Sequence, residues 1–326
     1  MKILYWGPNC DSGIEQIGFI YLLLLKLLGH EIDYSNAQSV NIHEIELKKL
    51  INSSNYDFII FNEAWNDIFK RTDFKNYPKN KVYNICHANL NVPKNVICLS
   101  LNYNYHMRIA NNYPIVYPLS YPFYFKNLIK KDFKDKKYKI GYIGRLEEGK
   151  FNNKVKDFLI KNNMKLDYCI ANKISNNYEI PYKEIFNNLN TNEIYEILLD
   201  TKYLLLPSTT ECISLVAGEA EACGCIPIVL ENSYLVHEQF KSSIKCFNIE
   251  EFNNTILKIY NNEFINSNTI NCEQQWHINR VKKQLELLFG KEKTIGKINL
   301  LDNGLMEEIH EKTLINAEII TGTTLI

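Results

Sequence analysis

The sequence predicts an α/β protein built from two Rossmann-like domains that face each other across a cleft. Its 326 residues suit two domains of ordinary size better than a single one. In both halves, short apolar runs typical of buried strands alternate with helical patterns, which is the order that builds a parallel sheet covered by helices. Prolines followed by a dense charge run separate the halves at about residues 120–137, as expected for an inter-domain linker.

The composition limits the classes of function. Hydrophobic residues make up 46% of the chain, which is enough for folded cores. The 37 Lys and Arg residues balance the 37 Asp and Glu residues, which leaves only a local basic patch as a route to nucleic acid. Nine cysteines without a CxxC pair, and the lack of a signal peptide, indicate a cytoplasmic, reducing setting.

The longest apolar stretch, residues 17–28, is interrupted by Gly18 and Lys26. It is shorter than a membrane span, which needs about 20 residues. We therefore expect no transmembrane segment, and contact with a membrane only at its surface.

The first half opens like a doubly wound domain. Residues 1–6 form the first expected strand, residues 14–28 a helix and residues 31–34 the second strand. The connecting loop contains Gly13, whose backbone could approach a phosphate or a sugar. A plain strand-to-helix turn is the alternative interpretation.

Three more strands are expected at residues 56–61, 82–87 and 95–101, with an amphipathic helix at residues 42–52 before them. His87 stands at the end of the second of these strands. Ligands of open parallel sheets bind beyond the carboxyl ends of the strands, so His87 is a candidate site residue. A lone histidine is nevertheless more often structural.

The second half starts with an expected strand at residues 138–143, and the loop after it matches part of a P-loop. Residues 144–150 fit the pattern GxxxxGK, but Phe151 stands where a Ser or Thr would hold Mg²⁺. Glu147 and Glu148 would add negative charge beside a phosphate. The sequence therefore argues against a P-loop.

Arg145 and Lys150 in this loop are the alternative means of binding a diphosphate. The guanidinium group of Arg145 can bond two phosphate oxygens at once, and Lys150 adds a second cation. Two solvated surface cations would be the default interpretation if this loop stood alone.

Further elements follow the same alternation. We expect a helix at residues 151–162, a strand at residues 165–170 and a helix at residues 193–199, which Asn190 and Glu193 would cap. Two later helices are expected at residues 250–261 and 272–289, the second ending at Gly290.

The second half is organised around residues 203–230, which predict a strand, a loop, a helix and a second strand. The first strand covers residues 203–206, the helix begins at about Ser214, and Gly224 ends it with a positive φ. A helix N-terminus that follows a strand is a binding site for an anion. Glu211 in the loop and Glu219 in the helix are carboxylates suited to sugar or ribose hydroxyls.

These residues resemble the GT-B glycosyltransferases, and in particular the retaining enzymes of glycosyltransferase family 4. The resemblance rests on Arg145 and Lys150 after a strand and on Glu211 and Glu219, which are separated by seven residues as in the family. The stretch EAEACGCIPIV is similar to the family's small-residue helix and the strand that follows it.

The resemblance covers about residues 1–290 and implies a separate role for each domain. Trp276 and the helix after it are similar to the family's last helix, which crosses back to the N-terminal domain. The implied parts are an acceptor-binding domain at residues 1–125, a nucleotide-sugar-binding domain at 126–270, the crossing helix at 271–290, and an extension of unknown role at 291–326.

The resemblance also implies the reaction: a sugar passes from a nucleotide-diphosphate sugar to a hydroxyl of a glycan, lipid-linked or small-molecule acceptor, with retention of configuration. Arg145 and Lys150 would neutralise the leaving diphosphate. The backbone amides of Ile213, Ser214 and Leu215 at the helix N-terminus would assist them.

The two glutamates take separate roles in this scheme. Glu211 would accept hydrogen bonds from the donor sugar, and Glu219 from the ribose, both as ordinary ionised carboxylates. His87 resembles a family histidine near the donor sugar. No DxD motif occurs, so neither a metal nor a separate cofactor is expected.

Two other functions stay open at this point. A transferase acting on hydroxymethylated bases in DNA could share the fold, with residues 126–139 as a basic strip, although the zero net charge disfavours it. A non-catalytic module that binds sugar nucleotides is the other, and the intact set of two cations and two glutamates argues against it.

Overall fold

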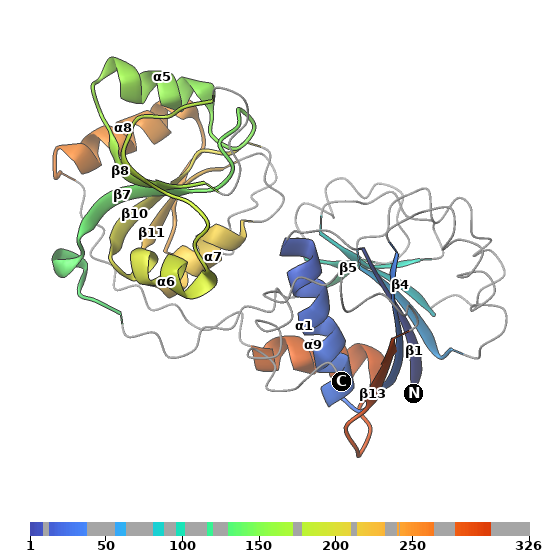
Figure 1. The fold of residues 1–326 in the computed structure, drawn as a ribbon. Helices are drawn as coiled ribbons and strands as arrows, with labels where there is room; N and C mark the ends of the chain where they lie inside the picture. Colours follow the sequence, from blue (N-terminus) through green and yellow to red (C-terminus); the bar gives the residue numbers. More distant parts are fainter. Residues whose placement is uncertain are drawn as a thin grey trace. The chain divides into compact units, whose positions relative to one another are not determined.

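The computed structural model of the chain describes residues 1–8, 13–37, 56–62, 81–87, 96–101, 116–119, 130–171, 178–209, 214–231, 240, 242–263 and 278–300. The chain divides into two compact units (Figure 1). The first contains Met1–Tyr124 and Gln275–Ile326, and the second contains Phe125–Gln274. Each unit has a parallel sheet, so the predicted class of two α/β domains is confirmed.

The first unit is built on a sheet with the strand order β13-β2-β1-β3-β4-β5-β6. All of its described strand pairs are parallel. Their inner residues are buried on both faces, which is why they appear in the sequence as continuous apolar runs. The strands are β1 (Lys2–Pro8), β2 (Glu31–Ala37), β3 (Phe58–Asn62), β4 (Val82–Cys86), β5 (Ile97–Ser100), β6 (Val116–Pro118) and β13 (Lys297–Leu300).

Two helices pack on this sheet among the described residues. Helix α1 (Gly13–Leu27) contacts β1 and β2, and helix α9 (Ile278–Phe289) lies beside α1. The Phe289 ring meets the rings of Phe58 and Tyr83 edge-on, at 5.3 and 4.9 Å between centroids. The helix expected at residues 42–52, and Trp276, lie outside the described residues.

Strand β13 lies where the sequence predicts no element. It pairs with β2 at the edge of the sheet, where Asn299 Nδ2 donates to Asp33 Oδ1 at 2.7 Å and Lys297 pairs with Glu31 at 3.1 Å. Gly296 makes this approach feasible, because a Cβ there would lie 1.8 Å from the carbonyl oxygen of His30. At least residues 297–300 of the extension therefore belong to the fold of the first unit.

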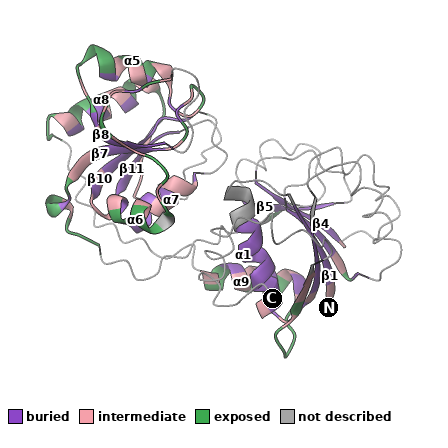
Figure 2. Cartoon of the chain, viewed as in Figure 1, coloured by how far each residue is buried: buried purple, intermediate pink, exposed green. Residues whose placement is uncertain are grey.

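The second unit contains a sheet with the order β12-β11-β10-β7-β8-β9, again parallel throughout the described pairs. Its strands are β7 (Tyr138–Ile143), β8 (Leu166–Ile170), β9 (Tyr182–Phe186), β10 (Thr201–Leu206), β11 (Ile226–Leu230) and β12 (Ile244–Cys246). Its helices are α5 (Asn153–Lys161), α6 (Thr191–Leu199), α7 (Leu215–Ala222) and α8 (Ile249–Tyr260). In Figure 2 the inner strands β7, β8, β10 and β11 are mostly buried, whereas the outer sides of α5, α6 and α8 are exposed.

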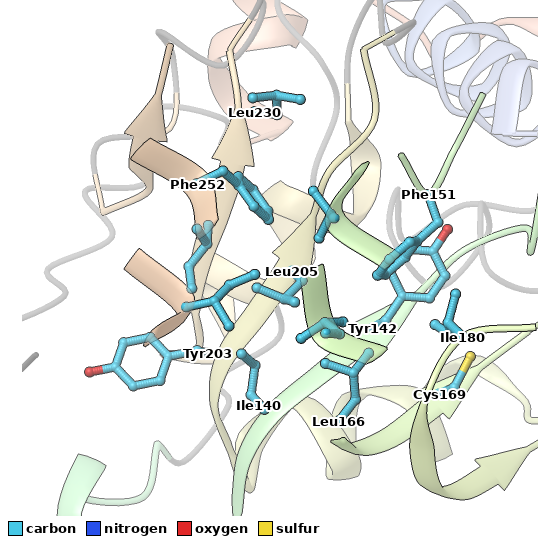
Figure 3. Packing of buried hydrophobic residues seen from close by; sticks show 14 of the residues in the cluster. Ile140, Tyr142, Phe151, Leu166, Cys169, Ile180, Tyr203, Leu205, Leu230 and Phe252 are labelled. Atoms are coloured by element: carbon cyan, nitrogen blue, oxygen red, sulfur yellow. The ribbon is translucent and has the colours of Figure 1, made fainter. Parts of the chain in front are cut away.

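Each face of this sheet has its own core, because side chains alternate along a strand. Tyr203 and Leu205 of β10 face α5 and α8, and Figure 3 shows this cluster. Leu204 and Leu206 face α6 and α7. The sheet is thus covered on both sides by helices, as Figure 1 also shows.

Three predicted signals of helix ends are confirmed. Asn190 and Glu193 form a reciprocal capping box at the start of α6, with bonds of 3.1 and 2.7 Å. Gly224 and Gly290 have φ of +67° and +78° after their helices, a conformation that costs glycine little.

The charge run before β7, which the sequence predicts as an inter-domain linker, contains a buried lysine. Lys136 is only 4% exposed, and its ammonium group donates to the carbonyls of Leu199 at 2.8 Å and Cys223 at 3.2 Å. These carbonyls lie at the C-terminal ends of α6 and α7, where the helix dipole favours a cation. Burial lowers the pKa of Lys136.

Within the described part of the chain, no helix is long and apolar enough to cross a membrane. The longest apolar helix is α1, whose residues from Phe19 to Leu25 are almost completely buried in the first unit. Its apolar run therefore serves a protein core.

Candidate functional site

The loop after β7 carries the two predicted cations, and we call residues 144–151 the cation loop. The amides of Lys150 and Phe151 both donate to the carbonyl of Glu147, at 3.0 and 2.9 Å, which closes the loop into a turn. Phe151 is fully buried, and its ring packs edge-on against Tyr142 at 4.9 Å between centroids (Figure 3). The residue after Lys150 is thus a core side chain, as expected if this loop is not a P-loop.

Arg145 projects from this loop with half of its side chain exposed. Its guanidinium Nη2 lies 3.1 Å from Oε1 of Glu147, so the two form an ion pair near the surface. Such pairs contribute roughly 0–1 kcal/mol, and an incoming anion can replace the carboxylate at small cost.

The loop after β10 touches the cation loop. Ser208 is 5% exposed, and its hydroxyl donates to the carbonyl oxygen of Gly149 at 3.1 Å. Strands β7 and β10 are neighbours in the sheet, so their carboxyl ends bring these loops together. Lys150, which is half-buried, is therefore anchored next to the loop that leads into α7.

Ser214 forms the N-cap of α7. Its hydroxyl accepts a hydrogen bond from the amide of Ala217 at 3.3 Å. The hydroxyl is therefore engaged, and what Ser214 and Leu215 can offer a ligand is their backbone amides at the helix N-terminus. Glu211 and Ile213 lie outside the described residues.

Glu219 lies in α7 with its side chain partly exposed, yet the surrounding protein raises its pKa to about 7. Its charge also contributes to the raised pKa of Tyr195 on α6, although burial is the larger cause there. The expectation that Glu219 is an ordinary ionised carboxylate is therefore wrong for the unliganded protein. A carboxyl group with this pKa is about half protonated at neutral pH.

The second carboxylate of the same helix has a different role. Glu221 is 6% exposed, and its Oε1 accepts a hydrogen bond from the amide of Ser242 at 3.0 Å. Glu221 thus holds the segment before β12, whereas Glu219 remains the candidate for ligand binding on α7.

In the first unit, His87 follows β4 and Asn62 ends β3, at the carboxyl ends of neighbouring strands. His87 Nε2 lies 2.8 Å from Asn62 Oδ1, and both side chains are almost fully buried. Gly18 of α1 packs against Asn62, because a Cβ there would lie 2.2 Å from Asn62 Nδ2. His87 is thus at the predicted strand end, in a fixed orientation.

Asn62 is a candidate site residue that the sequence analysis does not single out. Its signal is a polar residue directly after an apolar strand, which is where ligands bind in such sheets. Gly13 is the first residue of α1. Residues 9–12 before it lie outside the described part of the chain.

Comparison with known proteins identifies the fold. Neither a protein-family model nor a curated protein matches the sequence. The structure is similar to HepE from Anabaena in complex with UDP, with a TM-score of 0.61 and 12% identity over 88% of this chain and 99% of HepE.

Two further structures are similar. An alpha-glucosyltransferase in complex with UDP and DNA containing an HMU base gives a TM-score of 0.51 and 14% identity, over 90% of this chain and 96% of that one. TarM gives 0.52 and 14%, over 85% of this chain and 58% of TarM. The chain has the GT-B fold of these proteins.

Within the described residues, no group of three or more His, Cys, Asp or Glu side chains could hold a metal ion.

Proposed function

We propose that this protein is a retaining, metal-independent glycosyltransferase that moves a sugar from a nucleoside-diphosphate sugar to an acceptor hydroxyl. One observation carries the proposal: the hydrogen bond from Ser208 to Gly149 joins the cation loop to the loop that leads into α7. Two cations and a helix N-terminus are thereby brought to one end of one sheet. This combination suits a diphosphate.

The charges of the site fit a leaving diphosphate. Lys150 and Arg145 would bond its oxygens, and the amides of Ser214 and Leu215 would stabilise the charge that develops as the sugar departs. Arg145 already holds an anionic partner, Glu147, which a phosphate oxygen would replace. With these groups in place, we propose that no metal and no separate cofactor is needed.

We propose UDP as the nucleotide of the donor, because HepE and the alpha-glucosyltransferase are both seen with UDP. Glu219 would accept hydrogen bonds from the ribose and Glu211 from the sugar. Bonds from hydroxyl groups favour the ionised carboxylate, so donor binding would lower the pKa of Glu219 from about 7.

The first unit would bind the acceptor, with the pair of Asn62 and His87 at the ends of β3 and β4. In the proposed step, the acceptor oxygen forms a bond to the anomeric carbon while the bond to the diphosphate breaks. An oxygen of the leaving phosphate takes the acceptor proton on the same face of the sugar. A product with the anomeric configuration opposite to the donor's would refute retention.

A thermal-shift experiment tests the proposal. A ligand that binds the native state raises the melting temperature. At a hundredfold excess over Kd, the free energy of unfolding increases by about 2.7 kcal/mol. We expect UDP to raise it, UMP to raise it less and uridine least, because the cations act on the diphosphate. No response to UDP, GDP or ADP would contradict the proposal.

The same experiment with excess EDTA, which chelates divalent ions, tests whether binding needs a metal. We expect an unchanged response to UDP. A response to UDP that requires Mg²⁺ or Mn²⁺ would contradict the metal-independent mechanism.

A second candidate is a transferase acting on hydroxymethylated bases in DNA, since one of the similar structures holds such DNA. The described part of the basic strip weighs against it. Lys131 pairs with Asp200 at 2.6 Å, Lys139 bonds Asn262 at 2.8 Å, and Lys136 is buried. The strip also lies before β7 and at its first residues, at the opposite strand ends from the cation loop.

Gel retardation with duplex DNA at low salt separates the two candidates. Binding driven by phosphates weakens steeply as salt rises. We expect no salt-sensitive retardation, and retardation together with sugar transfer to the DNA would establish the second candidate.

We also propose a cytoplasmic location. The six cysteines within the described residues are Cys86, Cys98, Cys169, Cys223, Cys225 and Cys246, and all are buried free thiols. Reduced thiols are expected in that compartment.

A further inference from the structure

Three hydroxyl groups from three different segments hold the backbone of the cation loop. Each donates a hydrogen bond to a carbonyl oxygen of this loop. The donors come from β7, from the segment before β9 and from the loop after β10. The bonds are Tyr142 to Arg145 at 2.8 Å, Ser208 to Gly149 at 3.1 Å, and Tyr178 to Phe151.

Tyr142 fixes the backbone of Arg145. Its ring is almost fully buried and packs against Phe151, so the position of its hydroxyl is set by the core. The hydroxyl passes next to Gly144, where a Cβ would lie 2.7 Å from the hydroxyl oxygen. The glycine before Arg145 thus leaves room for this bond.

Ser208 and Tyr178 fix the backbone on both sides of Lys150. Ser208 holds the carbonyl before it, and Tyr178 holds the carbonyl after it. The Lys150 amide itself donates to Glu147 at 3.0 Å. Burial, with the charges of Glu148 and Asp157, raises the pKa of Tyr178 to about 12, so its hydroxyl remains a donor at neutral pH.

We propose that Tyr142, Tyr178 and Ser208 are positioning residues for a nucleoside diphosphate, which act through Arg145 and Lys150 without touching the ligand. The inference rests on the proposed function and adds these three residues to it. Cations on a backbone that is already fixed lose less freedom on binding, so more of their interaction energy appears as affinity.

The test compares three variants with matched controls. Tyr142→Phe, Tyr178→Phe and Ser208→Ala each remove one hydroxyl from the cation loop. Two control variants, Tyr260→Phe and Ser243→Ala, remove the same kinds of bond, from Tyr260 to Lys165 at 2.5 Å and from Ser243 to Phe240 at 2.7 Å. The control bonds precede β8 and β12, at the opposite ends of the strands.

Calorimetry with UDP and with uridine gives the readout, and thermal melting checks folding. A neutral hydrogen bond contributes about 0.5–1.5 kcal/mol, so each cation-loop variant should bind UDP roughly two- to tenfold more weakly. Uridine affinity should stay within about twofold, because uridine has no phosphate for the cations to hold. Both controls should bind UDP normally, and Ser208→Thr, which keeps the hydroxyl, should too.

Normal UDP binding by all three variants would overturn the inference while leaving the proposed function intact. Equal losses for UDP and uridine would also overturn it, since they indicate general damage. If the wild-type protein binds no nucleoside diphosphate, the proposed function fails and the inference fails with it. If a tyrosine variant does not fold, the comparison of Ser208→Ala with Ser208→Thr decides the outcome.

Discussion

The hydroxyl of Ser208 donates to the carbonyl oxygen of Gly149 at 3.1 Å, although 59 positions separate the two residues in the chain. Ser208 follows β10 and Gly149 follows β7, and these strands are paired in the sheet. The bond therefore fixes the distance between the two loops that follow these neighbouring strands. Lys150 is next to Gly149, so the bond also fixes the backbone position of this charged residue.

Replacing Lys150 with alanine should abolish most sugar transfer. A hydrogen bond that involves a charged group is worth roughly 1.5–3 kcal/mol, which corresponds to a loss of about 10- to 150-fold in kcat/KM. Steady-state kinetics with the donor identified by thermal shift would measure it. Lys154→Ala removes an exposed lysine of α5 and should leave kcat/KM unchanged. Near-normal activity of Lys150→Ala would contradict the assignment.

Donor affinity should depend on pH through Glu219. Its pKa is about 7 in the free protein, and hydroxyl groups of the ribose bond best to the ionised form. UDP affinity should therefore be highest above pH 7 and fall, at most about tenfold per unit, as the pH drops below 7. Calorimetric titrations at several pH values would show this, and Glu219→Gln should bind more weakly with a flatter profile. An unchanged slope in the variant would assign the pH dependence to another group.

The same group should make stability depend on pH. The folded pKa of Glu219 is raised above its ordinary value of 4.5, so its favourable contribution is complete below pH 4.5 and is lost as the pH rises through 7. Glu219→Gln should thus gain stability relative to wild type between pH 5 and pH 8, by on the order of 1–2 kcal/mol once partial exposure is allowed for. Melting curves at the two pH values measure the difference.

Completing the P-loop pattern should damage the protein and add no activity. Phe151→Ser would supply the missing residue of GxxxxGK[ST], but Phe151 is fully buried against Tyr142. Loss of a buried phenylalanine costs about 3–5 kcal/mol, which denaturant unfolding would reveal. Ile160→Ser, at a position that is 56% exposed, should cost far less. ATP hydrolysis by a folded Phe151→Ser variant would show that the cation loop can act as a P-loop after all.

Lys136→Met should destabilise the second unit without changing UDP affinity. The variant keeps the length of the side chain but leaves the carbonyls of Leu199 and Cys223 without their ammonium donor, at a cost of about 1–3 kcal/mol. Lys134→Met, in the same run but exposed, is the matched control. If UDP affinity falls in Lys136→Met but not in Lys134→Met, Lys136 belongs to the binding site.

The sequence predicts the inner strands and misses the outer ones, for a physical reason. Strands such as β1 and β10 are buried on both faces, so they consist of continuous apolar residues. The strands β9, β12 and β13 lie at sheet edges and contain charged, partly exposed residues, such as Lys183, Lys245 and Lys297. Charged residues on an edge strand prevent pairing with other chains. They also interrupt the apolar pattern by which a strand is recognised in the sequence.

The candidate site is predictable only at the level of residue types. Arg145, Lys150 and Phe151 stand in a recognisable pattern, because their positions along one loop are local. The bond between Ser208 and Gly149 depends on which strands become neighbours. The pKa of Glu219 depends on how far the folded protein buries its carboxyl group. Neither the hydrogen bond nor the pKa can be predicted from the spacing of residues along the chain.

Strand β13 has a consequence for the order in which the protein can form. The first unit begins at Met1 but its sheet is completed by residues 297–300, so the ribosome must synthesise the whole second unit before β13 can pair with β2. The second unit is continuous in sequence and can fold as its residues emerge. Until synthesis reaches β13, β2 remains an open sheet edge, available to chaperones or to other nascent chains.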